Sequence, residues 1–153
     1  MIGAPGSSLV LRFLDDLRAA EDAGAAVVDA WIAVCPLPSL RGGLRTIAER
    51  EAGHALLLEE RLRELGGACR AVVPEMMRAA ALARFGSPTV SDEEKLALVV
   101  AHYPEEGAVR RPIAHVLERF DPDLETRELL RLVAEGEGST VAWLRAYHAS
   151  LRG

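Results

Sequence analysis

Apolar residues recur at alternating intervals of four and three along four long stretches of the chain, which is the spacing of one buried face on an α-helix. The first helix is expected over about residues 8–34, and the second from about residue 39 to the glycine pair at 66–67. The third helix is expected to begin at Ser91 and the fourth at Asp121. No stretch shows convincing strand alternation, so the pattern predicts an all-α protein.

The ends of these helices are marked by local signals. Ser91 and Glu94 have the spacing of a capping box. Pro104 and Pro112 are expected to kink the third helix or to split it into two, because proline cannot donate the backbone hydrogen bond. In the sequence Asp121-Pro122, the aspartate is expected to cap the fourth helix and the proline to occupy its first position.

The connection between the second and third helices covers residues 68–90 and contains a short helix expected over residues 74–85. A connection of this length can cross a helix bundle from one end to the other. The layout therefore predicts a single domain over residues 1–153, folded as an up-down-down-up four-helix bundle with a short crossover helix.

The face of each helix that should be apolar carries one glutamate near its middle. These glutamates are Glu21, Glu51, Glu106 and Glu137. Carboxylates buried together repel one another unless protons or a cation neutralise them. His54 follows Glu51 by three residues, so both side chains lie on one face of the second helix and can reach one ion. Such an oxygen-rich set with an imidazole favours iron or manganese, as one or two ions. Glu49 and Arg50 fall off this face and are predicted to be solvated.

This pattern resembles the ferritin-like di-iron carboxylate proteins, which include bacterioferritins and rubrerythrins. Their four helices carry Glu, Glu-x-x-His, Glu and Glu-x-x-His in turn. Glu21 and the segment EAGH at 51–54 match the first two helices, and EGEGSTVAWL at 135–144 is similar to the fourth, with Glu137 in place. The resemblance implies a non-haem metal site that oxidises iron or reacts with dioxygen or peroxide, with metal ions and a small oxidant as its partners.

The chain departs from the family's pattern on the last two helices. Thr140 stands where the fourth helix of the family has its histidine. The glutamate of the third helix is either Glu105 or Glu106, and we favour Glu106 because it continues the apolar face. His102 lies one turn before Glu106 and is a candidate for the missing imidazole.

A second interpretation is a degenerate ferritin-like bundle that holds no metal and serves as a structural or interaction module. In that case Glu21 is expected to pair with an arginine at the centre of the bundle. Thr140 and the two prolines of the third helix favour this interpretation, whereas the four aligned glutamates oppose it.

Composition narrows the remaining possibilities. The net charge is −5 and the basic residues are spread among acids, so no nucleic-acid partner is expected. The N-terminus lacks the features of a signal peptide, and no run of about 18 apolar residues occurs, so we expect a cytoplasmic protein with no membrane partner. Cys35 and Cys69 are widely spaced, which agrees with reduced thiols.

Some apolar residues lie outside the predicted core faces, among them Val27, Leu56 and Leu57. Because a bundle with only 5% aromatic residues has spare apolar surface there, we expect a homo-oligomer. A dimer formed through the first and second helices is its simplest form.

Overall fold

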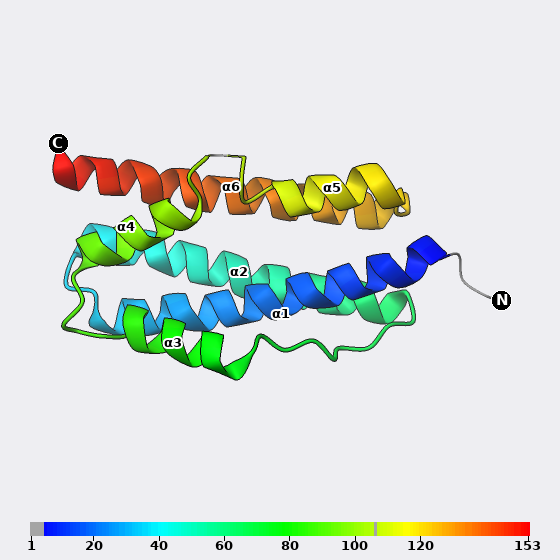
Figure 1. The fold of residues 1–153 in the computed structure, drawn as a ribbon, viewed down its shortest axis with the longest axis horizontal. Helices are drawn as coiled ribbons and strands as arrows, with labels where there is room; N and C mark the ends of the chain where they lie inside the picture. Colours follow the sequence, from blue (N-terminus) through cyan, green and yellow to red (C-terminus); the bar gives the residue numbers. More distant parts are fainter. Residues whose placement is uncertain (1–4, 106) are drawn as a thin grey trace.

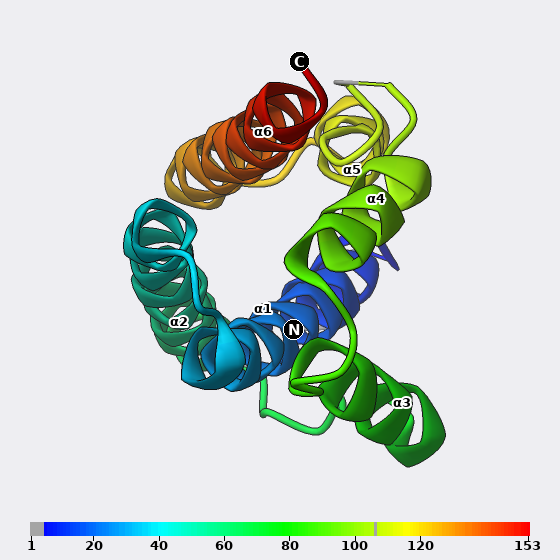
Figure 2. The same ribbon diagram turned by 90° about the vertical axis from the view of Figure 1, so that its left-hand side faces the viewer.

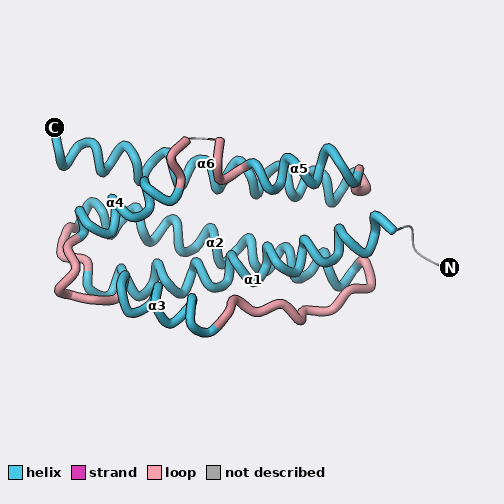
Figure 3. Tube along the Cα trace, in the orientation of Figure 1, coloured by secondary structure: helices cyan, strands magenta, loops and turns pink. Residues whose placement is uncertain are grey.

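The computed structural model describes residues 5–105 and 107–153, and this part of the chain is helical with connecting loops and no strand (Figure 3). Its helices are α1 (Pro5–Val34), α2 (Pro38–Glu64), α3 (Glu75–Phe85), α4 (Asp92–His102), α5 (Arg111–Phe120) and α6 (Leu124–Arg152). The prediction of an all-α protein is confirmed.

The long helices lie side by side along one axis. α1 and α2 run in opposite directions and form the most extensive helix pair (Figure 1). The connection after α2 then returns along the molecule, so that α4 and α5 run in the same direction as α2. α6 comes back in the direction of α1, beside α4 and α5.

α3 lies in this returning connection and packs against the outside of α1 (Figure 2). None of its residues is buried, and Met76 and Met77 are 87% and 65% exposed. The expected short helix at 74–85 is therefore present, with Pro74 just before its first residue.

The third long helix of the predicted pattern is split in two. α4 ends at His102, directly before Tyr103 and Pro104, and α5 begins at Arg111 with Pro112 in its first turn. Pro104 cannot continue the helix because it has no backbone N–H and its ring clashes with the preceding turn. The capping box of Ser91 and Glu94 at the start of α4 is confirmed.

The prediction for the start of the last helix is wrong by about two residues. Asp123 caps α6 rather than Asp121, and its carboxylate accepts hydrogen bonds from the backbone N–H and the hydroxyl of Thr126 at 3.0 and 2.7 Å. Asp121 has a left-handed backbone with φ 39°. That conformation turns the chain between α5 and α6, so Pro122 lies in the turn and not in the helix.

The buried apolar residues form two clusters, one towards each end of the bundle. One cluster consists of Val10, Leu14, Leu58, Leu62, Ile113, Val116, Leu130 and Val133. The other consists of Trp31, Cys35, Leu40, Leu44, Ile47, Leu96 and Leu144. Along α1, α2 and α6, the sequence interval between the two clusters contains Glu21, His54 and Glu137 respectively. The polar residues singled out from the sequence therefore lie in the middle of the bundle.

Within the described part of the chain, no helix combines the length and the apolar character needed to cross a membrane.

Candidate metal centre

Three helices each supply one side chain to a cluster at the centre of the bundle. Glu21 comes from α1, His54 from α2 and Glu137 from α6. Nδ1 of His54 lies 3.6 Å from Oε2 of Glu21 and 3.6 Å from Oε1 of Glu137. Glu21 is buried, with 5% of its surface exposed. Three of the residues predicted to bind metal are thus brought together from sites far apart in the sequence.

The spacing of these ligand atoms suits a single metal ion. One atom from each of the three residues lies within 4.8 Å of the other two. Oxygen and nitrogen ligands lie about 2.0–2.2 Å from a divalent ion, so two ligands of one ion are at most about 4.4 Å apart. If the distances between these three atoms shorten by less than about 1 Å, all three atoms can bind the same ion.

The cluster leaves buried polar atoms without hydrogen-bond partners. Among the described residues, Oε2 of Glu21, Nδ1 of His54 and Oε1 of Glu137 are buried and accept or donate no hydrogen bond, and the same is true of Oε2 of Glu51. Leaving a buried polar group unsatisfied costs about 1–3 kcal/mol, and more for a charged one. Four such atoms from neighbouring residues indicate a place where a cation or protons belong.

Two glycines make the close approach of these side chains possible. A Cβ atom at Gly24 would lie 2.9 Å from Oε2 of Glu51, and one at Gly136 would lie 2.7 Å from Cε1 of His54. Both distances are shorter than carbon contacts allow, so a side chain at either position would displace a site residue. The absence of a side chain at 24 on α1 and at 136 on α6 thus gives Glu51 and His54 their room.

Glu51 lies beside the cluster without belonging to its closest set of atoms. Its carboxylate faces α1 at Gly24, and it lines the same cavity as Glu21 and Glu137. Burial raises the pKa of Glu51 to about 8, and the charges of Glu137 and Glu21 add to the effect. At neutral pH its carboxyl group therefore holds a proton in the metal-free protein.

Glu21 and His54 also have raised pKa values, so both favour their protonated forms. Burial raises the pKa of Glu21 to about 7, although His54 opposes the shift. The proximity of Glu137 and Glu21 raises the pKa of His54 to about 9, against the opposing effect of burial. The protonated imidazole and the protonated carboxyls reduce the net negative charge that three buried glutamates would otherwise carry.

A cavity of about 490 Å³ connects the cluster with the break between α4 and α5. Glu21, Glu51 and Glu137 line it together with Tyr103 and with apolar side chains of α1 and α5. Burial raises the pKa of Tyr103, and the three carboxylates raise it further. The split of the third long helix therefore gives a small molecule a way to reach the glutamates.

The other two described candidates, His102 and Glu105, do not belong to the cluster. His102, the last residue of α4, lines the same cavity but its side chain is exposed, and it is not part of the set formed by Glu21, His54 and Glu137. Glu106, the favoured glutamate of the third helix, lies outside the described residues. Its alternative Glu105 is exposed and pairs with Arg111 at 2.8 Å.

The prediction that Arg50 is solvated is wrong. Its side chain is half-buried, and Nη1 donates hydrogen bonds to the carbonyl of Gly136 at 3.1 Å and to Oγ1 of Thr140 at 2.9 Å. The sequence contained a signal that could have shown this, because Arg50 lies four residues before His54 and thus on nearly the same side of α2. Glu49 is exposed, as predicted.

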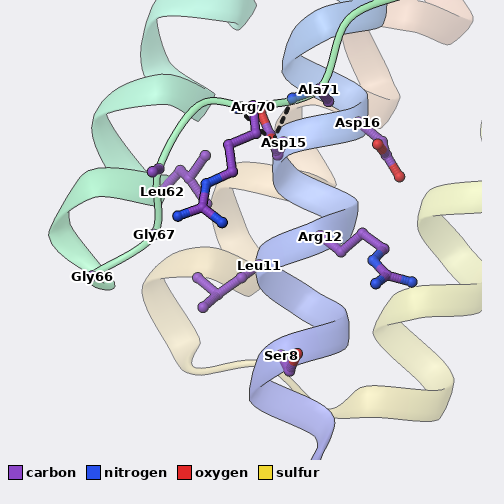
Figure 4. A pocket seen from close by; sticks show the side chains of 11 residues that line it. Ser8, Leu11, Arg12, Asp15, Asp16, Leu62, Gly66, Gly67, Arg70 and Ala71 are labelled. Atoms are coloured by element: carbon purple, nitrogen blue, oxygen red, sulfur yellow. Dashed lines mark hydrogen bonds between the residues drawn. The ribbon is translucent and has the colours of Figure 1, made fainter.

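A second cavity, of about 530 Å³, lies where the returning connection crosses α1 (Figure 4). There the carboxylate of Asp15 accepts hydrogen bonds from the backbone N–H groups of Arg70 and Ala71 at 2.9 and 2.8 Å. Arg18 donates to the same carboxylate and to the carbonyl of Ala71. These bonds tie the connection to α1, so Asp15 has a structural role.

No family model, no curated protein and no solved structure matches this chain.

Proposed function

We propose that the protein is a ferritin-like non-haem metal protein that oxidises ferrous iron or reacts with dioxygen or peroxide. The observation that carries the proposal is the set of four buried polar atoms, from Glu21, Glu51, His54 and Glu137, without hydrogen-bond partners. The directions of the long helices and the long returning connection support the ferritin-like assignment.

The residues present fit an iron or manganese ion. Carboxylate oxygens of Glu21 and Glu137 and Nδ1 of His54 would hold it, and this oxygen-rich set with one imidazole is the kind that these metals prefer. When bound, such an ion supplies a Lewis acid and a redox centre for the oxidant.

The chain itself contributes access and protons. The cavity between α4 and α5 admits a small oxidant, and its apolar wall limits bulk water around the glutamates. The carboxyl group of Glu51 lies next to the cluster and lines the same cavity, so it is placed to pass a proton to a small molecule bound there.

A bundle without catalysis is the second candidate, and a specific observation favours it. Because Glu21, Glu51 and His54 have raised pKa values of about 7, 8 and 9, protons can neutralise much of the cluster without a metal. The expected pairing of Glu21 with an arginine is not what the structure has, since its neighbour is His54.

Metal analysis of protein produced in iron-rich medium tests the proposal. We expect the wild type to hold a transition metal. Glu21→Gln and Glu51→Gln should weaken metal binding by about tenfold or more. Each variant nearly keeps the shape of the side chain and removes only its ability to carry a negative charge, so large changes in packing are avoided.

Glu49→Gln is the matched control, because Glu49 lies on the same helix, is exposed and should leave the metal content unchanged. A wild type that stays metal-free after reconstitution with Fe²⁺ and Mn²⁺ contradicts the proposal and favours the non-catalytic bundle. An equal loss of metal in Glu49→Gln and Glu51→Gln also contradicts it.

A further inference from the structure

The guanidinium group of Arg50 crosses from α2 to α6 beside the metal centre. Its Nη1 donates to the carbonyl of Gly136 and to Oγ1 of Thr140, the residues directly before and three after Glu137. Both acceptors belong to the turn of α6 that carries the glutamate ligand. Arg50 is therefore held by two hydrogen bonds rather than extended into solvent.

Thr140 is the position on α6 from which a second imidazole would reach the site. Residues three apart share one face of a helix, so Thr140 relates to Glu137 as His54 relates to Glu51 on α2. Thr140 is buried, with 6% of its surface exposed, and its hydroxyl accepts the hydrogen bond from Arg50. In the family that the sequence resembles, a histidine stands at this position of the fourth helix, and here the position is taken by the side chain that meets Arg50.

The missing side chain at Gly136 of α6 leaves room for Arg50 as well as for His54. A Cβ atom at Gly136 would lie 3.2 Å from Cδ of Arg50 and 3.0 Å from Nε2 of His54. Any other residue at 136 would push the side chains of Arg50 and His54 away from α6. Arg50 and His54 therefore pack against the same residue of α6, Gly136.

A fixed positive charge at this place has a consequence for metal binding. A guanidinium group stays protonated at all ordinary pH values, and like charges repel strongly where water is excluded. A second metal ion between α2 and α6 would have to displace this cation.

We propose that Arg50 takes the place of a second metal ion, so that the site binds one ion, held by Glu21, His54 and Glu137. This inference rests on the proposed function, because it concerns the number of ions at the same site. Arg50 is here a specificity-determining residue: its single positive charge stands where a two-metal centre has its second ion, and Thr140 anchors it.

Titration of the metal-free protein with Mn²⁺ under anaerobic conditions tests the inference. Bound ions are counted by metal analysis, and electron paramagnetic resonance distinguishes an isolated ion from a coupled pair. We expect one isolated ion per chain in the wild type. In the double variant Arg50→Gln/Thr140→His, we expect a second ion that binds at least about tenfold more tightly than any second ion in the wild type. Arg45→Gln, an exposed arginine on the same helix, should behave as the wild type.

Arg50→Gln alone guards against misfolding of the double variant, because it removes the charge with one polar substitution and leaves Thr140 in place. It too should gain measurable affinity for a second ion. Two ions of similar affinity in the wild type, or a single ion in both Arg50 variants, would overturn the inference and leave the proposed function standing. A wild type that binds no ion overturns both.

Discussion

Glu21, Glu51 and His54 bind protons more tightly in the folded chain than in an unfolded one. Their pKa values are about 7, 8 and 9, compared with 4.5, 4.5 and 6.5 for the unperturbed groups. The folded state therefore carries more protons than the unfolded state between about pH 4.5 and pH 9. Stability falls with rising pH wherever the folded state binds more protons, so the stability that protonation of these three groups contributes at low pH is lost as the pH rises to about 9.

We accordingly expect the free energy of unfolding of the metal-free protein to be lower at pH 9 than at pH 6. Each proton of difference contributes about 1.4 kcal/mol per pH unit. Urea unfolding in the presence of a chelator measures this. In Glu51→Gln one titrating carboxyl is gone, so the decline between pH 6 and pH 8 should be smaller than in the wild type. Glu49→Gln should follow the wild type, and a stability that rises from pH 6 to pH 9 would contradict the expectation.

At the scale of the helices, the site depends on how closely α6 approaches α2. The hydrogen bonds from Arg50 reach the backbone and a hydroxyl of α6, and His54 meets α6 at Gly136. A glycine inside a helix costs about 1 kcal/mol relative to alanine, so its presence at 136 is explained by this contact and not by helix stability.

Comparing Gly136→Ala with an alanine at another helix glycine should separate the effect of the close contact from the effect on helix stability. The Cβ that Gly136→Ala adds would lie 2.7 Å from Cε1 of His54, so the imidazole must move and metal affinity should fall by about tenfold or more. At Gly53, next to His54 on α2, an added Cβ meets no described atom within 4 Å. Gly53→Ala should therefore stabilise the protein by about 0.5–1 kcal/mol and leave metal affinity unchanged. Metal titration and thermal unfolding of both variants test this; unaltered metal affinity in Gly136→Ala would be the contrary result.

At the scale of the whole molecule, apolar side chains remain on the surface of α2. Leu56 and Leu57 are 67% and 50% exposed, and α2 packs against α1, which carries the half-buried Val27. Covering adjacent leucines removes apolar surface from water, which favours association by about 25 cal/mol for each Å². Leu56 and Leu57 belong to the apolar residues through which self-association was expected from the sequence.

We expect the protein to form a dimer through this surface at micromolar concentration. Leu56→Glu should shift it towards the monomer, because a buried unpaired carboxylate would oppose the contact. Met76→Glu, at an exposed position on α3, should leave the dimer intact. Light scattering of the three proteins decides the matter, and a monomeric wild type would disprove the expectation.

Much of the fold follows from interactions between residues close together in the chain. The helix period placed Glu21, His54 and Glu137 on inward faces, and the capping box at Ser91 marked the start of α4. Pro104 marked the break before α5 for an equally local reason, since it lacks the N–H that the helix needs. The start of α6 was placed too early because Asp121 and Asp123 are both good caps, and the turn after α5 decides between them.

The helices, their inward faces and the polar residues Glu21, His54 and Glu137 on those faces follow from the amino-acid sequence alone, because they depend on residues a few positions apart. The role of Arg50 was decided only by the tertiary structure. Its acceptors lie 86 and 90 residues away in the chain, and its long side chain can point to water or to a neighbouring helix with no change in the local pattern. Only the position of α6 beside α2 brings Gly136 and Thr140 within reach of Arg50, which places a fixed positive charge next to the cluster of Glu21, His54 and Glu137.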